Sequence, residues 1–178
     1  MSRLHTLTAS DATGQTADLF GTIQKSMGKV PNAYLTIGSN APALLGQMLQ
    51  LNASLHKGSL SARELEAINL AVSEESGCDY CLAAHTLAAK KAGFSEAQTL
   101  KLREARYDED ARLDALVQFV QYVVSTRGTL PATRVEALRA AGFSDQQVVE
   151  TLGAVSAILF TNMVNRVNDT VVDFPPVK

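Results

Sequence analysis

Residues 63–93, RELEAINLAVSEESGCDYCLAAHTLAAKKAG, contain the strongest structural and chemical signals in this chain. They predict one helix, a tight break at Ser76-Gly77, and a second helix that starts around Cys78. Alanine and leucine dominate the apolar residues on both sides of the break, and both have high helix propensity. The stretch therefore predicts two helices joined by a short turn, with a Cys-x-x-Cys motif at the start of the second helix.

The same helix signals recur along the rest of the chain. Four Ser or Thr residues have Glu or Gln three positions later, as in a capping box: Ser61/Glu64, Ser95/Gln98, Thr133/Glu136 and Ser144/Gln147. Five glycines follow periodic segments, as glycines that terminate helices do: Gly28, Gly58, Gly93, Gly128 and Gly142. We predict helices near 10–27, 42–57, 62–76, 79–92, 96–105, 110–126, 132–140 and 145–169. The expected fold is one all-α domain over 1–178, with a redox-motif core at about 61–93.

One short pattern occurs twice. Residues 92–98, AGFSEAQ, return as AGFSDQQ at 141–147. Each copy reads as the end of one helix followed at once by the cap of the next, with Phe94 or Phe143 placed to pack across the junction. We interpret the pair as the same helix corner used twice, because a repeat architecture needs at least three copies.

Composition excludes several classes of protein. Hydrophobic residues make up 46% of the 178 residues, which excludes intrinsic disorder. The net charge of −2 gives no basic excess for nucleic acid or an anionic membrane surface. Nowhere do about 18 consecutive apolar residues occur, so no membrane span is expected. We therefore expect a cytoplasmic protein that binds neither nucleic acid nor membrane.

The last predicted helix is apolar on nearly all sides. Its apolar residues between 148 and 167 cover more than one stripe of the helix surface. Such a helix must be central in the core or buried between subunits. In a domain of this size a subunit interface is the favoured way to cover the second face, so the sequence predicts a homo-oligomer.

The cysteine motif has a geometry that favours reactive thiols. Cys78 falls at a helix start, where unpaired backbone N–H groups and the helix dipole stabilise a thiolate. Cys81 and His85 are four residues apart and lie on one helix face. Ala84 and Ala88, on the same side, leave room for a neighbouring helix or a small substrate. The spacing therefore predicts a thiol activated by a nearby imidazole.

The preceding helix offers a carboxylate as a proton-transfer partner. Glu66 lies on a polar flank beside the apolar stripe, and it faces the cysteine helix if the two helices fold back on each other. Glu74 lies opposite the stripe and is expected in solvent. Glu75 is close to Cys78 in sequence and is the second choice.

Two other readings of the cysteine pair remain open. Cys78, Cys81 and His85 supply three zinc ligands on one segment, and Glu66 or a water could supply the fourth. The two thiols could also be buried and inert. A thioredoxin-like site is excluded, since that motif sits in a βαβ context that this helical sequence lacks.

These residues resemble the alkyl hydroperoxidase D (AhpD)-like branch of the carboxymuconolactone decarboxylase superfamily. That branch has a Glu twelve residues before Cys-x-x-Cys and a His four residues after it, which here are Glu66, Cys78, Cys81 and His85. Other family-like segments surround this core: Asn69–Ser73, Val30–Asn32, Ala41–Pro42, the Ala-Gly-Phe-Ser corner and Val172–Pro175. All of these except Asn69–Ser73 resemble the "peroxidase-related" members in particular.

The resemblance implies an all-helical fold that assembles as trimers or hexamers, and thiol peroxidase activity toward small alkyl or hydrogen peroxides. It implies Cys81 as the peroxidatic thiol and Cys78 as the resolving thiol, with His85 and Glu66 as a proton relay. It further implies a redox-active disulfide with no bound cofactor, reduced by an external dithiol protein or lipoyl group. Tyr80 departs from the family, whose founding members have His there.

Two alternatives stay open at this point. One is a decarboxylase of the same superfamily that acts through His85 and Glu66 without redox chemistry, although such enzymes lack the cysteine pair. The other is a thiol–disulfide or non-catalytic partner protein.

Overall fold

The computed structural model describes residues 2–177, which form nine α-helices and no strand. The helices are α1 (Gly14–Met27), α2 (Asn32–Asn40), α3 (Pro42–His56), α4 (Ala62–Glu75), α5 (Asp79–Lys91), α6 (Glu96–Arg103), α7 (Ala111–Thr126), α8 (Ala132–Ala140) and α9 (Asp145–Asn168). The all-α prediction is confirmed.

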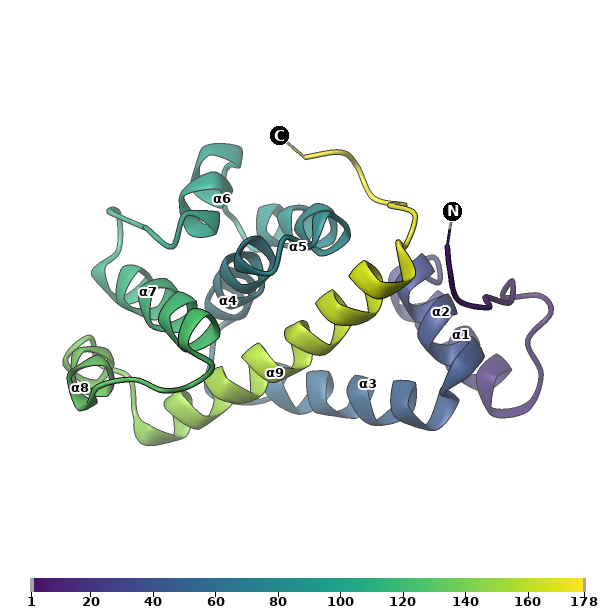
Figure 1. The fold of residues 1–178 in the computed structure, drawn as a ribbon, viewed down its shortest axis with the longest axis horizontal. Helices are drawn as coiled ribbons and strands as arrows, with labels where there is room; N and C mark the ends of the chain where they lie inside the picture. Colours follow the sequence, from purple (N-terminus) through teal and green to yellow (C-terminus); the bar gives the residue numbers. More distant parts are fainter. Residues whose placement is uncertain (1, 178) are drawn as a thin grey trace.

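Helix α9 runs across the molecule and connects its two ends (Figure 1). It packs against α4, α3, α5 and α2, and α4 in turn packs against α5, α6 and α7. Buried apolar side chains form a large cluster around α4 and a smaller one among α1, α2 and α3. Tyr34 on α2 packs against both clusters. The cysteine motif therefore lies near the junction of the two packed regions.

The local helix signals are correct with two exceptions. Ser61, Ser95 and Ser144 each form the complete predicted capping box. Thr133 does not cap a helix, because α8 starts directly after Pro131 and so includes Thr133 in its first turn. Gly58 has no left-handed backbone, unlike the other four predicted glycines. It lies instead against Glu150, where an added Cβ would come within 2.9 Å of a carboxylate oxygen.

The N-terminal end differs from the prediction in the start of the first helix and in one additional helix. The first helix begins at Gly14 rather than near residue 10. Helix α2 was not predicted, because its sequence NAYLTIGSN is rich in residues of weak helix propensity. Packing compensates: Gly38 approaches α1 so closely that an added Cβ would lie 2.5 Å from the Phe20 ring.

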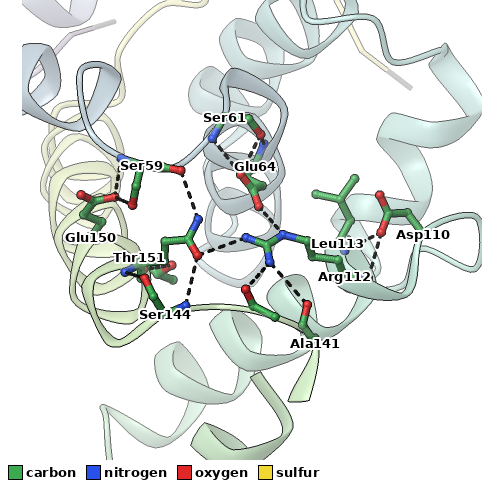
Figure 2. Close-up of polar contacts among 12 residues, drawn as sticks. Ser59, Ser61, Glu64, Asp110, Arg112, Leu113, Ala141, Ser144, Glu150 and Thr151 are labelled. Carbon is green, nitrogen blue, oxygen red and sulfur yellow. Dashed lines mark hydrogen bonds and ion pairs between the residues drawn. The ribbon is translucent and has the colours of Figure 1, made fainter. Parts of the chain in front are cut away.

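The repeated Ala-Gly-Phe-Ser segment forms the same corner twice, as predicted. Each buried phenylalanine is covered by an arginine from the start of an earlier helix, with Arg63 3.8 Å from the Phe94 ring centre and Arg112 3.7 Å from that of Phe143. Each arginine also donates to a carbonyl of its corner, Gly93 or Gly142. Arg112 in addition binds Glu64, which ties the second corner to α4 (Figure 2).

Among residues 2–177, α9 is the one helix whose length and hydropathy would allow it to cross a bilayer. In this fold it contacts six other helices, and 28% of its most apolar window is buried. The polar residues buried along this helix are Thr151, Asn162, Asn165 and Asn168. Apolar side chains remain exposed along another face, which are Val149, Leu152, Met163 and Val167.

Candidate active site

The break between α4 and α5 positions the cysteine motif as expected. Gly77 adopts φ 61°, a left-handed conformation that suits glycine. Cys78 then forms the N-cap of α5, and its Sγ accepts a hydrogen bond of 3.4 Å from the backbone N–H of Cys81. Local sequence thus brings a sulfur to the positive end of a helix.

The two sulfur atoms lie 2.7 Å apart, and both cysteines are buried. A hydrogen bond between them lets the pair share one proton. The hydrogen bond from the Cys81 side chain, assisted by the Cys81 backbone N–H, lowers the pKa of Cys78. The hydrogen bond to Cys78, together with burial, raises the pKa of Cys81. The same sulfur–sulfur contact thus lowers the pKa of Cys78 and raises that of Cys81.

Glu66 meets His85 across the two helices. Its Oε2 lies 2.8 Å from Nδ1 of the imidazole, and only 11% of its side chain is exposed. This contact fixes the ring orientation and leaves Nε2 for a molecule beside the pair. Of the other two candidates, Glu74 forms an exposed ion pair with Arg103 at 2.5 Å and Glu75 is exposed. Glu66 is thus the carboxylate that the fold places next to His85.

Cys81, Glu66 and His85 line one cavity of about 230 Å³. Ala84 and Ala88, which were expected to leave room for a neighbouring helix or a small substrate, also line it. Cys78 lines a different cavity, of about 290 Å³, on the side of Asp79 and Arg166. The two cysteines therefore line different cavities, and only Cys81 shares its cavity with the Glu66–His85 pair.

Three residues of this site could not be found from sequence spacing. Asn165 Nδ2 donates to Cys81 Sγ at 3.3 Å. Thr161, whose hydroxyl donates to the Ile158 carbonyl at 2.9 Å, lines the same cavity as this sulfur. Both side chains lower the pKa of Cys81 and oppose the effect of burial. Tyr34, on the unpredicted helix α2, lines the same cavity. The only sequence signal was the presence of asparagines in the otherwise apolar last helix.

Tyr80, between the cysteines, is used for a structural contact. Its hydroxyl accepts from the Ala33 backbone N–H at 3.1 Å and donates to Asp173 Oδ1 at 2.7 Å. Lys29 holds the same carboxylate at 2.9 Å. Phe174 packs edge-on against Tyr80, with ring centroids 5.5 Å apart, and lines the Cys81 cavity. The C-terminal segment singled out in the sequence thus forms one wall of the cavity.

Burial raises the pKa of Tyr80 well above its ordinary value, and the hydrogen bond to Asp173 adds to the effect. Burial also raises the pKa of Tyr34, with a further contribution from the negative charges of Cys81 and Glu66. Both phenols therefore stay protonated at neutral pH. Among residues 2–177, no group of three or more His, Cys, Asp or Glu side chains is arranged to hold a metal ion.

Comparison with known proteins places the motif within a known family model. Residues 42–121 match the carboxymuconolactone decarboxylase family model, and this range contains the whole motif. No curated protein matches the sequence significantly. A structure described as an AhpD core, an uncharacterised peroxidase-related protein from Ralstonia eutropha, is 20% identical with TM-score 0.86, over 97% of this chain and 92% of that one.

Two further structures share the fold. A putative antioxidant defence protein AhpD from Agrobacterium tumefaciens, of unknown function, is 25% identical with TM-score 0.68, over 79% of this chain and 95% of that one. The debrominase Bmp8, solved as a cysteine-to-alanine variant with 2,3,4-tribromopyrrole, is 19% identical with TM-score 0.81, over 97% of this chain and 92% of that one.

Proposed function

Because the chain belongs to the carboxymuconolactone decarboxylase superfamily, in its AhpD-like, peroxidase-related branch, we propose that it is a thiol peroxidase that reduces hydroperoxides through Cys78 and Cys81. One observation carries the proposal. The sulfurs lie 2.7 Å apart, and Cys81 faces the cavity that also holds the hydrogen-bonded Glu66–His85 pair. A nucleophile, a resolving thiol and a proton donor are thus close together.

The first step is oxidation of Cys81. With the shared proton on Cys78, which donates to Cys81 in the sulfur–sulfur hydrogen bond, the negative charge lies on the sulfur to which Asn165 also donates. The Cys81 thiolate attacks the terminal oxygen of the hydroperoxide, forming an S–O bond as the O–O bond breaks. Sulfur loses two electrons, and the leaving alkoxide takes a proton from His85, whose ring Glu66 holds in place.

The second step closes the disulfide. The Cys78 sulfur attacks the Cys81 sulfenic acid: an S–S bond forms, the S–O bond breaks, and the proton that Cys78 carried passes to the leaving hydroxide to give water. An external dithiol then reduces the disulfide by exchange, which restores both thiols. We propose a dithiol protein or a lipoyl group for this role, with no bound cofactor. Cys78 lines a cavity other than the one that holds Glu66 and His85, and we propose that the reductant binds there.

Reductive dehalogenation is the second candidate. It is favoured by the likeness to Bmp8, which covers 97% of this chain. Replacing a carbon–halogen bond with a carbon–hydrogen bond consumes two electrons, the number that a thiol pair releases when it forms a disulfide. The remaining alternative is a decarboxylase that uses His85 and Glu66 alone. Such an enzyme needs no thiol, so the cysteine pair does not support it.

The test is to count free thiols before and after one equivalent of tert-butyl hydroperoxide. We expect loss of both thiols in the wild type and no reaction in Cys81→Ser. In Cys78→Ser, Cys81 should persist as a sulfenic acid that dimedone traps. Unchanged thiols in the wild type would refute the peroxidase proposal. Loss of thiols with a bromopyrrole but not with hydroperoxide would favour dehalogenation, and a double serine variant with full activity would favour the decarboxylase.

We also propose that the protein works as a cytoplasmic homo-oligomer, a trimer or hexamer. The exposed apolar side chains on one face of α9 support this, since a second copy would cover them. Light scattering coupled to size-exclusion chromatography measures the mass directly. Monomeric protein at micromolar concentration would refute this part of the proposal without affecting the thiol chemistry.

A further inference from the structure

Helix α9 contains three buried asparagines spaced three residues apart, and two of them have partners for both ends of the amide. Asn168 accepts from the backbone N–H groups of Arg3 and Leu4 and donates to two threonine hydroxyls. Asn162 accepts from the Ser73 hydroxyl at 3.4 Å and donates to the Val72 carbonyl at 3.5 Å. These two amides hold the fold together.

Asn165, between them, is satisfied at one end only. Its Nδ2 donates to the Cys81 sulfur at 3.3 Å. Its Oδ1 is buried and has no hydrogen-bond partner among the described residues. Only 4% of the residue is exposed, so bulk water does not serve this oxygen. Buried polar atoms are nearly always paired, and an unpaired one next to a reactive group can serve in catalysis.

The position of Asn165 identifies where a partner for this oxygen would lie. The residue lines the cavity that Cys81 shares with Glu66 and His85, and it also lines the cavity on the Cys78 side. A molecule in contact with the Cys81 sulfur is therefore also close to the amide. To pair with Oδ1, that molecule must present a hydrogen-bond donor next to the atom that meets the sulfur.

A hydroperoxide has this property, because the oxygen that the thiolate attacks is the one that bears the hydrogen. We propose that Asn165 is a catalytic residue that recognises the O–H group of a hydroperoxide. Its Nδ2 donates to the Cys81 sulfur while its Oδ1 accepts a hydrogen bond from the terminal O–H of the substrate. This inference rests on the proposed peroxidase function and deepens it. A carbon-bound halogen has no hydrogen to offer at the attacked atom, so the same contact discriminates against halogenated substrates.

One amide then aligns both reacting atoms. The S–O bond forms between atoms that are each hydrogen-bonded to the Asn165 side chain, and the O–O bond breaks on the far side of the attacked oxygen. The hydrogen that Oδ1 accepts stays on that oxygen and becomes the proton of the Cys81 sulfenic acid. The alkoxide that leaves takes its proton from His85, as in the mechanism above. Atoms and electrons balance without any other reactant.

The test compares two reactions of Cys81 in the whole protein. Alkylation by iodoacetamide requires only a thiolate, whereas oxidation by tert-butyl hydroperoxide also uses the proposed O–H contact. The quantity to measure is the ratio of the oxidation rate to the alkylation rate at one pH, with the modified cysteine identified by peptide mass spectrometry. A residue with a purely structural role would change both rates together and leave the ratio unchanged.

Asn165→Leu removes both hydrogen bonds with little change in size, and we expect the ratio to fall about tenfold or more. Asn165→Asp keeps an acceptor but loses the donor to sulfur, so we expect slower alkylation with the ratio retained. Asn162→Leu is the matched control, one step along the same buried row and not in contact with sulfur. It should leave the ratio unchanged. Circular dichroism and chromatography verify that each variant is folded.

The outcomes separate this inference from the function it rests on. A wild type that hydroperoxide does not oxidise refutes the peroxidase proposal and this inference together. A wild type that is oxidised, with the same ratio in Asn165→Leu, refutes only the role of the Asn165 oxygen. A fall in the ratio in Asn162→Leu as large as in Asn165→Leu would also refute it. If Asn165→Leu does not fold, a lower ratio in Asn165→Asp than in the wild type overturns the proposal.

Discussion

Two buried glutamates on helix α4, Glu64 and Glu66, are used in opposite ways. Glu64 accepts hydrogen bonds from the Ser61 N–H and hydroxyl at 2.7 Å each, and its other oxygen accepts from Arg112 Nε at 2.9 Å (Figure 2). Among the described side chains, Glu66 hydrogen-bonds only to His85, and it lines the cavity with Cys81. Burial is similar, at 7% and 9% exposed.

The difference between them is the hydrogen-bonding capacity that the protein leaves unused. Arg112 also donates to the Gly142 carbonyl and to Gln147, so the carboxylate of Glu64 belongs to a network that joins α4, α7 and the start of α9. Such a group stabilises the fold and has nothing to offer a ligand. Glu66 has a spare oxygen and a titratable partner beside a cavity, which is what proton transfer needs.

The largest effect expected from this comparison is slower thiol oxidation in the Glu66→Gln variant. The variant can still accept a hydrogen bond from His85 but cannot take part in proton transfer. We expect oxidation of the thiols by hydroperoxide to slow by about 100-fold or more, with stability changed by less than about 1 kcal/mol. Stopped-flow kinetics and chemical denaturation measure the two effects. Glu74→Gln, at the exposed Arg103 pair on the same helix, is the control and should retain the wild-type rate.

Glu64→Gln is expected to show the reverse pattern. The substitution removes the charge opposite Arg112 and leaves too few acceptor sites for the three donors, so we expect a loss of about 2–3 kcal/mol in the free energy of unfolding. The rate of thiol oxidation in the folded protein should change less than threefold or so, on the order of 0.6 kcal/mol. A Glu64→Gln protein with wild-type stability and impaired chemistry would contradict the assignment of Glu64 to the scaffold.

Tyr80 lies between the cysteines, yet its substitution should resemble that of Glu64. It should lower stability, by a smaller amount, rather than the rate of thiol oxidation. Its hydroxyl uses both its donor and its acceptor capacity within the protein. Tyr80→Phe should therefore lower stability by about 1 kcal/mol and leave thiol oxidation nearly unchanged. An effect on the oxidation rate as large as that of Glu66→Gln would place Tyr80 in the relay instead.

Alkaline pH offers an independent check on Tyr80. Because the pKa of Tyr80 is raised in the folded protein from its ordinary 10.0, the stability from this group is complete below pH 10. Above it, the unfolded chain releases a proton that the folded protein retains, so stability falls as pH rises. Urea denaturation between pH 9 and about pH 11 should show this decline. The decline should be weaker in Tyr80→Phe, and an equal slope in both proteins would contradict it.

The sequence by itself determined the features that depend on residues close together in the chain. Three of four capping boxes, four of five predicted terminal glycines and the break at Gly77 follow from backbone preferences and side-chain contacts within a few residues. The position of Cys78 at the start of α5 is local in the same sense. The resemblance to AhpD-like proteins likewise depends on spacing that the sequence shows directly.

Tertiary structure decided which distant groups meet. It selected Glu66 over Glu75, formed α2 from weak helix formers, and brought Tyr34, Thr161 and Asn165 to the sulfur from helices remote in sequence. It also divided one row of asparagines into two satisfied amides and one with a free oxygen. Such contacts depend on how helices pack, and hydrophobic packing is non-directional, so no short pattern in the sequence specifies them.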